Sequence, residues 1–410
     1  MKTDKKNTFI VAYACEPNET SEPGVGWNFS QEISKFMNIT LLTRSNNKKS
    51  IESVSNDAKI NYIYYDLPNY LTILKKKIPF GLQLYYIFWQ IGAYKKAKKI
   101  INSEKKYDIF HHLTFGMTKM VPPLFMINIP SIWGPIGGGD RIPYHFLKGN
   151  GIKPYISEFI YRTLHQVSNY SPFSFMARRS VNAIVFRTNS SLNNFPTNGC
   201  KRRYVFSETA STSLEKKDIY KNLDTEFQIL CIGRMIQSKG YIFALKGFKD
   251  FLDNGGKAKL VFLGKGPEEE TLKHYVKENS LEKSVIFKGF LPNSEVKEHL
   301  EKAHILLHPS FREGGSWSIM EAMSYGLPTI CLDTSGPKDM VTDKCGILIP
   351  LGSTTEVVTD ISKALFSLTS DKKQYQIFSE NAQKRIRLSY NWGNRAQQIH
   401  KVYDEVLKVN

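Results

Sequence analysis

The sequence has few features of a secreted, membrane-spanning or metal-binding protein. Its 410 residues include five cysteines, an odd number, widely spaced and without a Cys-x-x-Cys pair. This argues against a disulfide framework or a zinc site and agrees with a reducing compartment. No stretch approaches the ~18 apolar residues of a membrane span, and the charged start lacks the apolar region of a signal peptide. We therefore expect a cytoplasmic protein.

Acidic residues are scarce relative to basic ones. The chain has 56 Lys and Arg against 38 Asp and Glu, a net charge of +18. Such a bias suits nucleic acid, anionic lipid headgroups or phosphorylated substrates. No nucleic-acid recognition motif is present, and no strand is followed by the Gly-x-Gly-x-x-Gly of a dinucleotide-binding dehydrogenase. The apolar fraction of 41% and charged fraction of 23% are those of a folded protein.

Short apolar runs alternate with longer amphipathic ones, which is typical of parallel sheets with crossover helices. The polar stretch Lys201–Glu226 reads as a linker. We predict an α/β fold of two Rossmann-like doubly wound domains, 1–205 and 215–390, facing across a cleft. An amphipathic helix over 391–410 is expected to pack back on the first domain. Ten strands are predicted: Thr8–Ala14, Ile39–Thr43, Asn61–Tyr65, Ile109–Leu113, Ser131–Trp133, Gln228–Gly233, Lys259–Leu263, Val285–Lys288, Ile305–His308 and Thr329–Leu332.

Two cations follow the first strand of the second half. The strand ends at Gly233, and Arg234 and Lys239 follow at the carboxyl edge of the sheet, where ligands of such sheets bind. Five residues apart around a turn, they can converge on one diphosphate. The alternative is that Arg234 and Lys239 are solvated surface cations. For this motif taken alone, that is the more common outcome.

Two carboxylates, Glu313 and Glu321, lie eight residues apart around a predicted helix start. Because carboxylates repel a diphosphate, they should address uncharged groups such as sugar hydroxyls. For Glu321 the alternative is a capping box with Ser318. Small residues between them let backbone N–H groups approach an anion at the helix N-terminus: Gly314, Gly315 and Ser316.

These motifs together resemble the donor-binding half of a family 4 glycosyltransferase with the GT-B fold. The resemblance covers nearly all of Gln228–Pro350, and it continues at Ser21–Trp27 and Trp133–Asp140. These two stretches are similar to a bacterial branch found in surface-polysaccharide assembly, such as O-antigen or capsule. The matching motifs of the second half are Gly233-Arg234…Lys239-Gly240, Leu263-Gly-Lys-Gly-Pro267, Phe287-Lys-Gly-Phe-Leu291, Glu313-x7-Glu321 and Gly326-Leu-Pro328.

The resemblance implies a role for each matching residue of the second half. Arg234 and Lys239 would neutralise the leaving nucleoside diphosphate, with Gly233 beside them. Glu313 would lie against donor-sugar hydroxyls, and Glu321 would accept from the ribose hydroxyls. The backbone around one further residue would line the base: Phe290.

In the first half, the resemblance implies that Gly24 and Gly26, in the loop after the first strand, let this domain approach the diphosphate. Relatives also keep a histidine at the end of a strand, where this chain has His111 and His112. Strand alternation points the two rings to opposite faces, and either could face the cleft. A hydrogen-bonded structural histidine is about as strong an interpretation as a catalytic one.

The resemblance also implies retention of the anomeric configuration. The sequence contains no Asp-x-Asp metal clamp, so the two cations predict catalysis with no metal and no other cofactor. Bulky Trp317 and polar Ser316 and Ser318 depart from the small or aliphatic residues of many relatives. Ser335 stands where a glycine is usual.

The segment Leu74–Ile100 combines Tyr, Phe and Trp with clustered lysines. This composition is typical of a helix on an anionic bilayer, and the net charge of +18 supports that interpretation. The alternative is an ordinary helix whose aromatic side chains fill the core and whose lysines are solvated.

We therefore predict a retaining glycosyltransferase, peripherally bound to the inner face of the membrane, that moves a sugar from a nucleotide-sugar donor to a lipid-linked oligosaccharide acceptor. One alternative is another enzyme of the same fold, such as a nucleotide-sugar epimerase or a glycogen-type synthase or phosphorylase. The other is a basic non-enzymatic protein that binds nucleic acid or a membrane surface.

Overall fold

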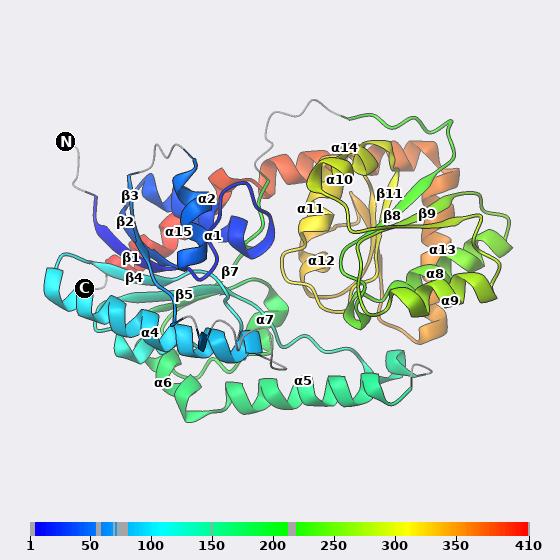
Figure 1. Ribbon diagram of the computed structural model, residues 1–410. Coiled ribbons are helices and arrows are strands. Elements are labelled where there is room, and N and C mark those ends of the chain that lie inside the picture. The colour runs from blue at the N-terminus through cyan, green and yellow to red at the C-terminus, as the bar shows by residue number, and fades with distance from the viewer. Residues whose placement is uncertain are drawn as a thin grey trace. The chain divides into compact units, whose positions relative to one another are not determined.

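The computed structural model describes residues 5–54, 59–68, 70–71, 81–148, 151–211 and 219–408. The chain forms two compact units, each built around one parallel sheet with helices packed on it (Figure 1). Unit 1 comprises Met1–Gly139, Tyr161–Glu208 and Trp392–Asn410, and unit 2 comprises Asp140–Ile160 and Thr209–Asn391. The predicted class, two Rossmann-like α/β domains, is confirmed.

The sheet of unit 1 has the strand order β3-β2-β1-β4-β5-β6-β7. All five strands predicted for the first half are present, while β6 and β7, of four and three residues, were not predicted. The bounds are β1 Asn7–Val11, β2 Asn38–Thr43, β3 Ile60–Tyr64, β4 Ile109–His112, β5 Ser131–Ile136, β6 Ala183–Phe186 and β7 Arg203–Val205.

The sheet of unit 2 has the order β10-β9-β8-β11-β12-β13. The five strands predicted for the second half are again present, and one four-residue strand, β13, was missed. The bounds are β8 Gln228–Ile232, β9 Lys259–Leu263, β10 Val285–Gly289, β11 Ile305–His308, β12 Thr329–Leu332 and β13 Gly346–Ile349.

The helices of the described residues connect and cover these strands. Those of unit 1 are α1 Ser21–Ser34, α2 Lys48–Glu52, α4 Gly81–Glu104, α6 Pro172–Ser180, α7 Asn189–Asn193 and α15 Trp392–Leu407. Those of unit 2 are α8 Tyr241–Asp253, α9 Glu269–Glu278, α10 Asn293–Lys302, α11 Trp317–Ser324, α12 Ser335–Met340, α13 Thr354–Ser370 and α14 Lys372–Ser389. The boundary between the units falls within α5, Lys153–Asn169. No described helix is both long and apolar enough to cross a bilayer.

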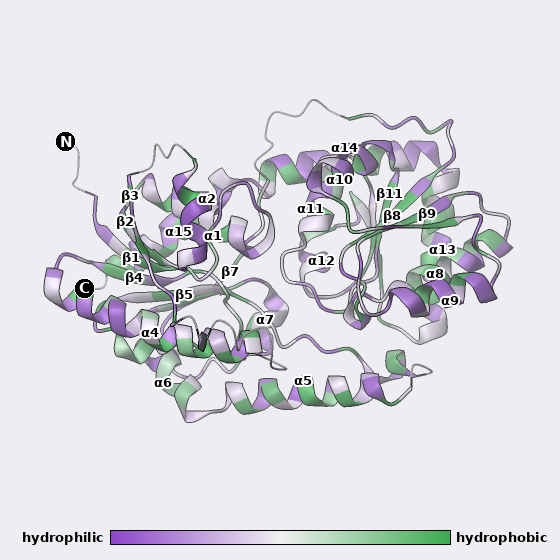
Figure 2. Cartoon of the chain, in the orientation of Figure 1, coloured by the Kyte–Doolittle hydropathy of each residue, from purple (hydrophilic) through white to green (hydrophobic). Residues whose placement is uncertain are grey.

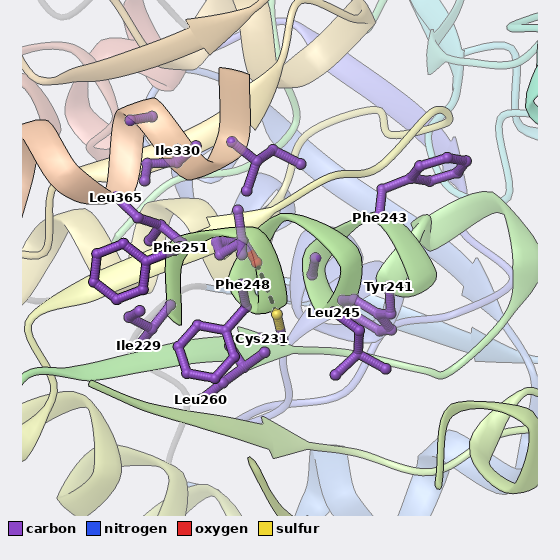
Figure 3. Close-up of a cluster of buried hydrophobic side chains, with 14 of the residues drawn as sticks. Ile229, Cys231, Tyr241, Phe243, Leu245, Phe248, Phe251, Leu260, Ile330 and Leu365 are labelled. Atoms are coloured by element: carbon purple, nitrogen blue, oxygen red, sulfur yellow. Dashed lines mark hydrogen bonds between the residues drawn. The ribbon is translucent and has the colours of Figure 1, made fainter. Parts of the chain in front are cut away.

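Among the described residues, one of the two hydrophobic clusters of unit 2 lies between the sheet and helices α8 and α13. Figure 3 shows Phe248 and Phe251 of α8 close to Ile229 of β8 and Leu365 of α13. All four side chains are fully buried. Burial of each such side chain contributes about 1.5–3 kcal/mol, so this layer fixes β8 and the start of α8, which frame the candidate site.

In unit 1, the C-terminal helix α15 packs against α1, where the rings of Phe29 and Trp392 lie edge to face with centroids 5.4 Å apart. The predicted first domain, 1–205, includes residues 140–160, which the structure instead groups with unit 2. The reason is hydrophobic packing: the ring of Phe146 lies 5.3 Å from that of Phe243 and 4.8 Å from that of Phe311.

Helix α4 holds most of the segment expected to contact a membrane. Its largest aromatic side chains, Tyr86, Trp89 and Tyr94, are fully buried in the core of unit 1. The expectation that these rings meet lipid is therefore wrong, and the alternative of a core helix holds for them. The first part of the predicted segment, 74–80, lies outside the described residues.

Candidate active site

The candidate site of unit 2 is built on charged side chains at the carboxyl edge of its sheet. Lys239, at the end of a short 3₁₀ turn after β8, forms an ion pair with Glu313 of the loop between β11 and α11. The same carboxylate oxygen lies 3.2 Å from Nε2 of His308, the last residue of β11. The structure thus brings together two predicted residues, Lys239 and Glu313, and adds a histidine.

Electrostatics keep this cluster charged. Burial opposes ionisation of Glu313, but the charge of Lys239 and the hydrogen bond from His308 outweigh it and lower the pKa of the carboxyl to about 2. Burial lowers the pKa of His308, so its ring is neutral near pH 7. In a neutral ring that donates from Nε2, Nδ1 is an acceptor and needs a donor, and Nδ1 is buried without a partner among the described residues.

The loop that carries Glu313 is held by its backbone. The carbonyl of Glu313 accepts a 2.7 Å hydrogen bond from the hydroxyl of Ser335 and a 3.0 Å bond from the backbone N–H of Gly336. A Cβ atom at Gly336 would lie 1.5 Å from the carbonyl oxygen of Gly314, so only glycine fits there. Ser335 has a φ of 25°, a region that glycine adopts more easily. This explains why a serine is unusual at that position.

The neighbouring Arg312 turns away from the cluster. Its guanidinium forms an ion pair with the buried Glu158 of α5 and donates a 2.9 Å hydrogen bond to the carbonyl of Asp140. Burial lowers the pKa of Arg312 to about 10, which leaves it charged. Two adjacent residues of one loop are therefore each fixed by an ion pair.

Helix α11 begins differently from the capping-box alternative. Its N-cap is Ser316, whose hydroxyl accepts from the backbone N–H of Ile319 at 3.4 Å. Glu321 is the fifth residue of the helix, whereas a capping box requires the third. The pairing of Glu321 with Ser318 as a capping box is therefore wrong, and Glu321 lies about one turn inside the helix.

The remaining predicted site residues of unit 2 either have exposed side chains or are glycines that contribute only their backbone. Arg234 is exposed, and no hydrogen bond or ion pair engages its side chain in the described part of the chain. Gly233 has a φ of 140°, which only glycine adopts easily. Phe290 follows β10 and is 78% exposed. Gly314 and Gly315 are half-buried beside Glu313.

In unit 1, Gly24 and Gly26 lie in the first turns of α1 and not in the predicted loop. A Cβ atom at Gly26 would lie 2.0 Å from the carbonyl oxygen of Ala14, and one at Gly24 would lie 2.1 Å from that of Glu19. The physical reason for these glycines is thus the close approach of the 14–19 backbone to the helix.

His111 and His112 point to opposite faces of the sheet, as strand alternation predicts. His111 is bonded to the Tyr403 hydroxyl at 2.9 Å and the Gly134 carbonyl at 2.8 Å. His112 lies 3.2 Å and 3.1 Å from the hydroxyls of Tyr86 and Tyr94. Both rings are buried, and burial lowers their pKa values to about 4 and about 3. These neutral, fully bonded rings have structural partners.

Sequence reasoning missed a buried charge cluster in unit 1. Arg187, directly after β6, forms ion pairs with Glu22 of α1 and with Glu208, the latter at 3.1 Å. Burial disfavours the charged guanidinium, but the two carboxylates outweigh it and raise its pKa. The available signal was a lone arginine at the end of the apolar run 183–186, which was not predicted as a strand. His308 had the same kind of signal: a polar residue closing a buried strand.

No group of three or more His, Cys, Asp and Glu side chains that could hold a metal occurs within the described ranges.

The topology of both units and their pairing in one chain define the GT-B fold. A sucrose-phosphate synthase from Thermosynechococcus elongatus superposes with a TM-score of 0.64 at 13% identity, covering 99% of this chain and 100% of that one. TarM gives a TM-score of 0.68 at 13% identity and 99% coverage of both chains. Anabaena HepE in complex with UDP gives 0.63 at 13% identity, over 97% of this chain and 100% of that one.

Sequence comparison points to the same class. The family model described as "Glycosyl transferases group 1" matches residues 213–385, which lie in unit 2. A poly(glycerol-phosphate) alpha-glucosyltransferase of Bacillus subtilis is 27% identical over 54% of this chain and 34% of its own length. The putative colanic acid biosynthesis glycosyltransferase WcaL of Escherichia coli is 32% identical over 31% of this chain and 33% of its own length. The chain thus spans about a third of the length of these two relatives, and the family match lies within unit 2.

Proposed function

We propose that this protein is a glycosyltransferase of bacterial polysaccharide biosynthesis that moves a sugar from a nucleotide-sugar donor to an oligosaccharide acceptor. The observation that carries the proposal is the Lys239–Glu313–His308 cluster at the carboxyl edge of the unit 2 sheet. It lies within the stretch that matches glycosyl transferases group 1. Relatives named for colanic acid and teichuronic acid biosynthesis support the polysaccharide context.

The donor would bind unit 2 through its diphosphate. Glu313 holds the ammonium of Lys239 at the sheet edge, where its remaining N–H donors, together with exposed Arg234, would neutralise the leaving group. Glu321 would accept from the ribose, and Glu313 would contact the sugar. The base would lie along the backbone at Phe290. UDP bound to HepE supports a nucleoside diphosphate as the product.

His111 and His112 of unit 1 are left out of this proposed machinery, because both ring nitrogens of each already have partners. Gly24 and Gly26 are retained only as residues that set the path of the 14–19 backbone.

We further propose that the reaction retains the anomeric configuration, as in family 4, and needs no metal. NMR of the product formed from an α-linked nucleotide sugar should show a new α-linkage, whereas a β-linkage would contradict retention. Activity should survive EDTA. Complete loss with EDTA, restored by a divalent ion, would contradict metal independence.

The acceptor is proposed to be lipid-linked, which places the enzyme on the inner face of the membrane as a peripheral protein. The net charge of +18 supports attraction to an anionic surface. Transfer to a lipid-linked acceptor should exceed transfer to the same oligosaccharide without its lipid when membranes are present. Equal rates would contradict this part of the proposal.

Thermal shift with a panel of nucleoside diphosphates and nucleotide sugars tests the central proposal. A ligand at ~100 times its Kd stabilises the folded protein by about 2.7 kcal/mol, so the matching nucleotide should raise the melting temperature clearly. No response to any nucleotide would contradict a donor site. An epimerase, a glycogen-type synthase or a nucleic-acid-binding protein is not favoured, because the family match and the relatives described above are glycosyltransferases.

A further inference from the structure

Helix α5 turns its polar side inward. Its most buried residues are Glu158, His165 and Asn169, which are 2, 6 and 4% exposed. Their spacing of seven and four places them on one side of the helix. Glu158 pairs with Arg312, and Nδ1 of His165 lies 3.2 Å from the hydroxyl of Thr118. Polar contacts therefore hold the helix in place.

The opposite side of α5 presents large hydrophobic side chains to solvent. Helix α6 follows two residues later, and it exposes Phe173, Phe175 and Met176. Figure 2 shows hydrophobic residues recurring along both helices. A surface helix of a soluble protein normally has the reverse arrangement, so this face is suited to being covered. On α5, five side chains are between 46 and 66% exposed: Ile156, Phe159, Ile160, Leu164 and Val167.

The charge around this face indicates what covers it. Residues 109–207 contain eleven Lys and Arg, of which Arg178 is buried and Arg187 is ion-paired, but only two acidic residues, Asp140 and Glu158. Both acidic side chains are buried, whereas Lys153 and Arg179 are exposed. A second copy of the chain would bring like charges together, which is unfavourable. An apolar face bordered by basic residues instead matches an anionic bilayer.

We infer that the outward face of α5, continued by α6, docks on an anionic lipid bilayer. The helix would lie in the plane of the interface, with its apolar side chains in the headgroup and acyl boundary. The inference rests on the proposed function in that a lipid-linked acceptor must be met at a membrane. It moves the contact from α4, where Tyr86, Trp89 and Tyr94 are buried although Phe88 is 54% exposed, to α5.

Vesicle sedimentation of the full chain tests the inference. Vesicles of phosphatidylglycerol and phosphatidylcholine should bind the protein, more weakly in 1 M salt, and vesicles of phosphatidylcholine alone should bind it less. The variant Phe159→Ser with Val167→Ser should bind at least tenfold more weakly, because two large apolar groups no longer enter the interface. Both residues are exposed, so the fold should tolerate the change.

The matched control is Ile377→Ser with Leu388→Ser on α14, where the two side chains are 47 and 62% exposed. It should bind vesicles like the wild type. Equal binding by the α5 variant and the control, or no binding by the wild type, would overturn the inference. So would a wild-type dimer in sedimentation velocity that only the α5 variant dissociates, because a second copy would then cover the face.

A nucleotide thermal shift on the same samples separates this inference from the proposed function. Wild type, α5 variant and control should respond alike to the matching nucleoside diphosphate. Nucleotide binding without vesicle binding would overturn the docking surface alone. Vesicle binding that depends on α5, with no response to any nucleotide, would overturn the proposed function and support the surface.

Discussion

The fourth strand of each sheet ends in a histidine, and the two histidines have different surroundings. His112 closes β4 in the order 3-2-1-4, and His308 closes β11 at the equivalent place in unit 2. The partners of His112 are the neutral hydroxyls of Tyr86 and Tyr94 on α4. The partner of His308 is the carboxylate of Glu313, which also binds Lys239.

The difference shows that the sheet topology places a histidine at the end of the same strand in both units. The segments packed around that strand decide whether the histidine contacts a charged site residue or belongs to the core. In unit 2, the loop after the strand is rich in glycine and returns a carboxylate to the histidine. In unit 1, a long helix covers the strand with aromatic rings, so the histidine becomes part of the core. We therefore expect the charged side chains around Arg187 to stabilise the fold of unit 1 and those around Lys239 to bind a ligand in unit 2.

The largest expected effect concerns the buried charge of unit 1. Arg187→Met should lower the free energy of unfolding by about 3–5 kcal/mol, because it leaves the buried Glu208 and the half-buried Glu22 without their counter-ion. Urea denaturation measures this value. Arg203→Met, at an exposed position of β7, is the control and should change stability little. If Arg187→Met were as stable as the wild type, the proposal that the ion pairs of Arg187 stabilise unit 1 would be contradicted.

In unit 2, removing the cation Lys239 should mainly reduce the rate of sugar transfer. Lys239→Ala should reduce the rate of sugar transfer about 100- to 1000-fold, because a donor to the leaving group is lost. The melting temperature should also fall, because the Glu313 carboxylate, only 17% exposed, loses its counter-ion, so turnover is compared at a temperature where both proteins are folded. Lys363→Ala on α13, where the side chain is 74% exposed, is the matched control. Unchanged turnover for Lys239→Ala would remove this residue from the site.

The second half was easier to predict from sequence than the first. Its strands are short apolar runs that end at a glycine or a charged residue. Lys239 and Glu313 could be predicted as site residues because each follows such a strand, β8 or β11. The sequence left a structural and a catalytic role open for His111 and His112, and it could not decide between them because their partners come from residues up to 292 positions away. The roles of Arg187 and the inverted polarity of α5 depend likewise on distant contacts, which no local pattern encodes.

The pH dependence of stability sharpens the comparison of the two histidines. His112 has a pKa of about 3 in the folded protein against 6.5 in the reference state. Its neutral form therefore adds stability that is complete above pH 6.5 and is lost as the pH falls toward 3. Between pH 7 and pH 5 the loss should be about 2 kcal/mol. The stability difference between wild type and His112→Phe, from urea denaturation, should shrink by that amount, and a constant difference would contradict the buried neutral ring.

The smallest expected effect separates stability from binding within one helix of unit 2. Ser316→Ala removes the N-cap of α11 and should cost about 1 kcal/mol of stability. Glu321→Ala lies beyond the capping position, so it should cost less stability but weaken nucleoside diphosphate binding about tenfold, through the lost ribose contact. Calorimetric titration with the nucleotide, beside melting temperatures, measures both quantities. If Glu321→Ala bound nucleotide as tightly as the wild type, the ribose contact would have to be assigned to another residue of the sheet edge, with exposed Arg234 and Lys265 as the next side chains to change.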